Sequence, residues 1–413
     1  MNDLTKKVAL HIIHRVQHGH PPEHGFQYFT AGLNPYLSLL DREYFSSFLK
    51  QGGSSFKLVV GTYGGGKTHF LYCVREIAWQ HDFAVSYVNL SHEASPFYQL
   101  DLVYATIVKG IMPPLSPDEL ISGYEKGLDS FIKGWVASRQ AELISKGFTG
   151  DKLRKELLAS AQSLSGIEST SFNNAIYAAF SAVVDHRDED FRSACQWLKG
   201  EGYNRGVHSK LGILQKIDKT TAFSMIRSLL QWVRQIGYSG LAILLDEATM
   251  ETSLTTKQRE RHLNNLREVI DECGHMNIQG AIIFYAVPDL NFLDGRTQTY
   301  AALNQRLSNV FERLNPTGVK VELDQVLGNT EEEAITFLTE VGTKLAEIYS
   351  KAYDHGFDDA VMQEVLSDIA HAVYRKRFAD IGYRREFVKK AVQGLSYLHH
   401  EVVPPTLKQL GLV

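Results

Sequence analysis

Residues 61–68 read Gly61-Thr62-Tyr63-Gly64-Gly65-Gly66-Lys67-Thr68, which matches the phosphate-binding loop pattern GxxxxGK[ST] at every fixed position. The apolar run at residues 56–60 predicts a buried strand before the loop, and residues 69–80 predict a helix after it. Glycines between a strand and a helix allow successive backbone N–H groups to turn toward phosphate oxygens. The sequence therefore predicts an α/β fold with a P-loop NTPase core, in which helices flank a parallel sheet. The alternative is an ordinary glycine-rich turn.

The polar residues of the loop have expected roles in binding the nucleotide. We expect Lys67 to contact the β- and γ-phosphates of ATP and the Thr68 hydroxyl to bind Mg²⁺. The other positions of the loop and the first residue after it are expected to surround the phosphates: Gly61, Thr62, Tyr63, Gly64, Gly65, Gly66 and His69. Residues 24–36 are the candidate wall of the adenine site, with no individual contact assigned.

A second buried strand supplies the acidic partners that such a loop needs. Five apolar residues at 241–245 precede Asp246 and Glu247. Because the strands of an open parallel sheet end at one edge, we expect Asp246 to lie beside the loop and to hold Mg²⁺. Glu247 is expected to polarise the attacking water, which favours ATP hydrolysis over transfer to a small acceptor. The alternative is a strand that merely ends in acidic, solvent-facing residues.

The composition is typical of a folded intracellular protein. With 413 residues, 44% of them hydrophobic and 22% charged, the chain is long enough for two or three structural units. The net charge of −4 excludes a global attraction to nucleic acid, so any contact with double-stranded DNA needs a local basic patch. Three scattered cysteines, no export signal and no run of 18 apolar residues predict a cytoplasmic protein that does not cross a membrane.

Helical and strand patterns divide the chain unevenly. Strand patterns recur at residues 83–88, 281–286 and 319–323, whereas helical patterns fill residues 112–237. We expect four parts: N-terminal helices with the first half of the ATPase core (1–110), a helical insertion (111–237), the second half of the core (238–325) and a C-terminal helical lid domain (326–413). Aromatic residues in the insertion have spacings that favour a helical core over a platform for stacking bases.

Several of these motifs also resemble a known family. They are His18-Gly19-His20-Pro21-Pro22, the loop through Leu71, and residues 83–91 and 238–247. Together they resemble the BrxD-like ATP-binding proteins of bacterial BREX-type phage-resistance operons, over most of the chain. The resemblance implies an ATPase of the AAA+ or a related P-loop type. It further implies that the protein works with other defence-operon proteins on DNA or on invading phage.

Such ATPases place a polar sensor at the end of a core strand and an arginine finger beyond it. The strand at residues 281–286 ends without Asn or Thr, so Tyr285 or Asn291 is the candidate substitute. Arg306 is the first candidate for a finger, supplied in trans within a nucleotide-dependent homo-oligomer, and Arg313 is the second. The alternative is a surface arginine that pairs with a neighbouring acid such as Glu312.

A further arginine belongs to Arg384-Arg385-Glu386-Phe387, which resembles the lid motif of the same ATPases. Arg385 is expected to fold back onto the nucleotide and to make lid closure depend on ATP. Residues 375–390 hold seven basic and two acidic side chains, a net charge of +5. That charge equally fits a DNA-contacting face, whose binding weakens with salt, or an ordinary solvated helix.

Two functions remain open at this point. The first is an ATP-hydrolysing machine that acts on DNA or on a DNA-bound partner. The second is a nucleotide-gated switch whose slow turnover times the assembly of defence complexes. Glu247 favours the first function, whereas the missing polar sensor favours the second.

Overall fold

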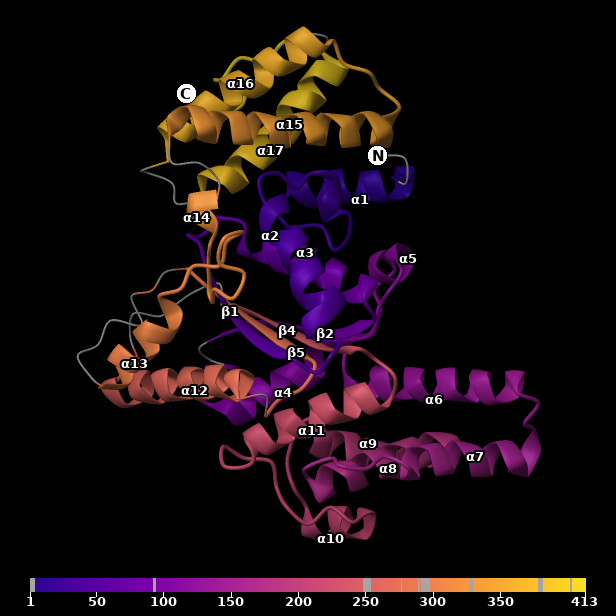
Figure 1. The fold of residues 1–413 in the computed structure, drawn as a ribbon. Coiled ribbons are helices and arrows are strands. Elements are labelled where there is room, and N and C mark those ends of the chain that lie inside the picture. Colours follow the sequence, from indigo (N-terminus) through magenta and orange to yellow (C-terminus); the bar gives the residue numbers. More distant parts are fainter. Residues whose placement is uncertain are drawn as a thin grey trace.

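The structure is a computed structural model that describes residues 4–91, 94–247, 254–275, 277–288, 290, 298–326, 330–377, 382–401 and 403–413. Three layers are visible in Figure 1, with a central sheet between two groups of helices. The C-terminal helices lie above the sheet together with the N-terminal helix, and the long helices of the middle of the chain lie below it.

A six-stranded sheet forms the middle layer, with the strand order β3-β2-β4-β5-β1-β6. The strands are β1 (Ser54–Val60), β2 (Phe83–Leu90), β3 (Ile111–Met112), β4 (Gly240–Glu247), β5 (Ala281–Val287) and β6 (Lys320–Glu322). All neighbours pair in parallel except β3, which is antiparallel to β2. The predicted α/β class with a mostly parallel sheet is confirmed. The two-residue strand β3 was not expected, because so short a run carries no strand pattern.

One face of the sheet is covered by α3 (Lys67–Gln80), α2 (Asn34–Leu39) and the π-helical segment η2 (Leu40–Phe48). Their apolar side chains share one core with Ala242 and Leu244 of β4. Successive residues of a strand point to opposite faces, so this is also the face toward which Asp246 points. The β1–α3 connection, which contains the phosphate loop, therefore lies on the same side as Asp246.

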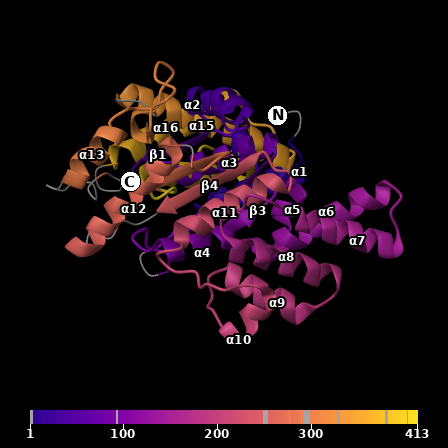
Figure 2. The same cartoon turned by 60° about the horizontal axis from the view of Figure 1, so that its bottom comes forward.

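The opposite face is covered by α4 (Leu100–Gly110), α11 (Ala222–Gln235) and α12 (Thr256–Gly274). Helices α6 (Leu128–Ser145), α7 (Gly150–Gln162), α8 (Thr170–Val184) and α9 (Asp188–Leu198) pack further out and extend sideways from the sheet in Figure 2. Phe172, Trp197 and Trp232 are fully buried in a core that is continuous with the sheet. The expectation that these aromatic residues build a helical core is confirmed.

The N-terminal helix α1 (Lys6–Gln17) packs against the C-terminal helices α15 (Glu331–Tyr353) and α17 (Tyr383–His400). With α16 (Asp359–Arg375) they share a core that includes Ile12, Leu345 and Phe387. Short helices complete the described structure: α5 (Pro117–Ile121), α10 (Arg205–His208), α13 (Gln298–Leu307) and α14 (Leu323–Val326). The boundaries of an insertion and of a lid domain stay predictions.

Candidate functional site

The phosphate loop connects the end of β1 to the first residue of α3. Gly64 and Gly66 have φ angles of 71° and 96°, a region that glycine adopts without strain. A Cβ atom at Gly65 would lie 2.8 Å from the Thr62 carbonyl oxygen, so this position is also closed to larger residues. Lys67 is buried, and its Nζ donates to the carbonyl oxygens of Gly61 at 2.7 Å and Thr62 at 3.1 Å. The Lys67 side chain thus lies inside the loop, where it is expected to contact the β- and γ-phosphates.

Thr68 and Asp246 meet beside this loop, although 178 positions separate them in the chain. The Thr68 hydroxyl donates to Asp246 Oδ2 at 2.6 Å. A hydroxyl and a carboxylate are hard oxygen ligands of the kind that Mg²⁺ prefers, so these two residues fit the ion. Asp246 as a residue is only 4% exposed, so it is largely shielded from bulk solvent.

Tyr87 is a partner of Asp246 that the sequence did not reveal. Its hydroxyl donates to Asp246 Oδ2 at 2.7 Å from the neighbouring strand β2. Burial, and after it the negative charge of Asp246, raises the pKa of Tyr87 far above its usual range. The phenol therefore keeps its proton and fixes the carboxylate. The sequence did not reveal this role of Tyr87 because an aromatic residue inside a buried strand has the pattern of a core residue.

Glu247 points away from Asp246, to the other face of the sheet. Its carboxylate accepts a hydrogen bond from the Tyr285 hydroxyl of β5. The Tyr285 oxygen also lies 3.2 Å from Nε2 of His262, on α12. Of the two sensor candidates, Tyr285 thus lies beside Glu247, whereas Asn291 lies outside the described residues.

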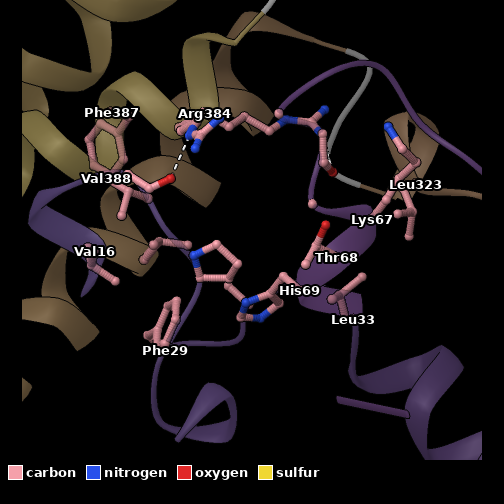
Figure 3. Close-up of a pocket in the computed structure, with 18 of the residues that line it drawn as sticks. Val16, Phe29, Leu33, Lys67, Thr68, His69, Leu323, Arg384, Phe387 and Val388 are labelled. Carbon is pink, nitrogen blue, oxygen red and sulfur yellow. Dashed lines mark hydrogen bonds between the residues drawn. The ribbon is translucent and has the colours of Figure 1, made fainter. Parts of the chain in front are cut away.

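A cavity of about 340 Å³ opens above the phosphate loop (Figure 3). Lys67, Thr68 and Asp246 line its polar end. Its apolar walls come from both ends of the chain: Val16, Phe29, Ala31 and Leu33 from the N-terminal segment, and Phe337, Leu338, Val341, Phe387 and Val388 from α15 and α17. This volume lies within the range of small-molecule sites, roughly 300–1,000 Å³.

His69 forms part of the cavity wall but brings no charge to it. Its Nε2 lies 2.8 Å from the Thr30 hydroxyl, and its ring meets Phe26 and Phe29 edge-on. Burial lowers the pKa of His69 to about 4, so the ring is neutral at pH 7. Tyr63, by contrast, is 48% exposed at the rim of the loop.

Arg384 and Arg385 reach the loop from the start of α17, with different contacts. Arg384 Nη1 donates to the Gly65 carbonyl oxygen at 2.9 Å and lies 3.3 Å from Asp324 Oδ1. Arg385 donates to the Gly19 carbonyl oxygen at 2.6 Å and to the Tyr63 hydroxyl at 3.0 Å. Both arginines line the cavity and contact the loop, Arg384 through the Gly65 backbone and Arg385 through the Tyr63 side chain. The sequence placed both arginines in the lid motif and favoured Arg385, which stays a prediction.

Asp324 is a further residue that sequence reasoning missed. It lies on α14, next to the last strand of the sheet. One carboxylate oxygen accepts from the Thr62 backbone N–H at 2.9 Å, and the other accepts from the Thr62 hydroxyl at 3.2 Å. Since Arg384 pairs with the same carboxylate, Asp324 joins the phosphate loop to the C-terminal helices.

The two candidate arginine fingers lie elsewhere. Arg306 of α13 donates from Nε to Asp271 Oδ1 of α12 at 2.8 Å. Arg306 thus pairs with an acid, as in the alternative to a finger, but the acid is Asp271 rather than Glu312, because α13 packs on α12. Arg313 is exposed in a turn before β6. Within the described part of the chain, neither arginine is among the residues that line the cavity.

The basic segment at residues 375–390 is partly engaged within the protein. Lys389 and Lys390 approach the Glu386 carboxylate at 3.5 and 3.6 Å, and the Arg377 guanidinium lies over the ring of Tyr374. Arg384 and Arg385 face the cavity. Fewer cations are therefore left for a DNA-contacting face than the net charge of +5 implies.

One of three comparisons with known proteins found a match. A family model described as "BREX system ATP-binding protein BrxC/D" matches residues 4–406. A search of curated proteins and a search of solved structures each found no match. Of the helices that the structure describes, none has the length and apolar character needed to span a bilayer.

Proposed function

Because the chain belongs to the BREX system ATP-binding family BrxC/D, we propose that it is a magnesium-dependent, AAA+-like ATPase of phage defence. The observation that carries this proposal is the 2.6 Å contact between Thr68 and Asp246 beside the loop that holds Lys67. Two hard oxygen ligands next to a phosphate loop are what a Mg²⁺-nucleotide requires. A hydroxyl that pairs with a buried carboxylate is not needed to pack an apolar core.

The cavity has apolar and polar parts, which suit different parts of the nucleotide. Its apolar lining, which includes Phe29, Leu33, Val341 and Phe387, suits the adenine ring. Its polar end suits the triphosphate, which backbone N–H groups of the loop and the Lys67 ammonium would hold. When bound, Mg²⁺ neutralises phosphate charge, and Thr68 and Asp246 are the residues that would hold it.

Hydrolysis needs a base and a cation at the γ-phosphate. Glu247 is the residue with the chemistry of the base, and Arg306 or Arg313 of a second copy is the candidate cation. Neither arginine lines the cavity of its own chain, so a finger at this site would come in trans from a second copy in a homo-oligomer. In this reading, residues 326–413 act as the lid and residues 111–237 as the insertion that selects a DNA or protein target, alongside other defence-operon proteins.

ATP turnover measured with and without double-stranded DNA tests this function. We expect magnesium-dependent turnover that rises with DNA and is lost in Glu247→Gln. Glu168→Gln is the matched control, because Glu168 pairs with Arg227 in the helical layer far from the cavity. Turnover that Glu247→Gln leaves unchanged would contradict the proposal.

One observation favours the nucleotide-gated switch as a second candidate. Glu247 is bound by Tyr285 on the face of the sheet opposite to Asp246, so the described state is poorly arranged for hydrolysis. ATP turnover with and without double-stranded DNA, together with partner binding with and without a non-hydrolysable ATP analogue, separates the two candidates. A switch is expected to change its assembly or its partner binding with the analogue while turnover stays at background.

A further inference from the structure

Glu247 is partly buried at one end of a chain of three polar side chains, and the other two, Tyr285 and His262, are buried. Tyr285 lies in the middle of β5 and is fully buried, and its ring stacks on Phe97 at 4.8 Å between centroids. The Tyr285 hydroxyl contacts Glu247 on one side and His262 on the other. His262 is 3% exposed and comes from α12. A buried polar chain in an otherwise apolar core calls for a specific role.

The protons of this chain follow from the number of donors. Tyr285 has one hydroxyl proton, and it donates that proton to the Glu247 carboxylate. At the contact with His262, the phenol oxygen must then accept, so Nε2 of His262 carries the proton there. Burial lowers the pKa of His262 to about 4, so this neutral arrangement holds throughout the physiological pH range. His262 therefore donates a hydrogen bond to Tyr285, and Tyr285 donates one to Glu247.

We propose that Tyr285 is a positioning residue that holds Glu247 away from the nucleotide in the resting protein, with His262 orienting the phenol. Hydrolysis then begins only when the carboxylate leaves Tyr285 and turns toward the phosphates. This inference rests on the proposed ATPase function. It goes beyond that function because it attributes slow ATP turnover in the resting protein to one hydrogen bond, between Tyr285 and Glu247.

Steady-state kinetics of Tyr285→Phe test the proposal. The variant removes one hydroxyl and keeps the ring, so we expect kcat to rise about tenfold or more while KM for ATP is unchanged. Tyr104→Phe is the matched control, because Tyr104 is fully buried and donates to the Leu198 carbonyl oxygen at 2.8 Å, far from Glu247. A kcat that stays level or falls in Tyr285→Phe overturns the inference.

A double-mutant cycle gives a second readout that does not need turnover. Thermal midpoints of the wild type, Tyr285→Phe, Glu247→Gln and the double variant are compared with and without the magnesium complex of a non-hydrolysable ATP analogue. We expect coupling between the two positions without the analogue and loss of that coupling with it. Coupling that is absent, or that the analogue leaves unchanged, overturns the inference. Zero turnover in every variant refutes the ATPase proposal instead, and the cycle still decides the role of Tyr285.

Discussion

Replacing Lys67 by methionine is the sharpest test of the phosphate site. In the structure, Nζ donates to two carbonyl oxygens, and the side chain is only 6% exposed. A bound triphosphate replaces these neutral acceptors by anionic ones. If the exchange is worth one charge-assisted hydrogen bond, roughly 1.5–3 kcal/mol, then its loss raises Kd for Mg²⁺-ATP about ten- to hundredfold. Methionine keeps the aliphatic length, so the loop loses the charge with little change in packing.

Isothermal titration of purified protein with Mg²⁺ and a non-hydrolysable ATP analogue measures this change. Lys199→Met is the matched control, since Lys199 is a partly buried lysine that pairs with Asp129 at 3.1 Å in the helical layer. We expect the control to bind the analogue like the wild type, and both variants to keep the helical content of the wild type. Binding of the analogue by Lys67→Met within twofold of the wild type would refute the reasoning.

Three further changes test other parts of the site and the fold. Asp246→Asn keeps the shape of the side chain but removes its charge, so we expect ATP affinity to become insensitive to Mg²⁺ in titrations with and without EDTA. Arg384→Gln loses the contact with Gly65 and is expected to weaken ATP binding roughly tenfold, more than Arg385→Gln, in the same titration. Burial lowers the pKa of Lys57 to about 7, so the unfolded chain holds more protons between pH 7 and 10.5. The free energy of unfolding should then rise with pH in the wild type, by up to about 1.4 kcal/mol per unit, and not in Lys57→Met, as denaturant titrations would measure.

The parts of the site that the sequence predicted are those encoded by local pattern. The glycine-rich turn and Lys67 lie in one continuous motif, and Asp246 follows an unbroken apolar run whose end marks the sheet edge. Five or six residues are enough to show the apolar pattern of a strand, and the residues that flank this run show where the strand ends. These features depend on short-range chemistry, which a single sequence contains.

The parts that escaped prediction depend on packing between distant segments. Arg384 and Arg385 are adjacent, so only the docking of α17 decides which of them reaches Gly65. Asp324 is 262 positions from Thr62, and nothing in its local sequence points to the phosphate loop. Tyr285 was a candidate sensor, but its contact with Glu247 follows from the register of β4 against β5, which the sequence does not show.

The cavity walls have a consequence for how the protein is made. Phe29 and Leu33 are synthesised early, whereas Phe337 and Phe387 emerge from the ribosome after most of the chain. A nascent chain that already carries the phosphate loop therefore still lacks the C-terminal part of the cavity wall. If the cavity binds the base as proposed, we expect fragments left by interrupted translation to bind ATP more weakly than the full chain.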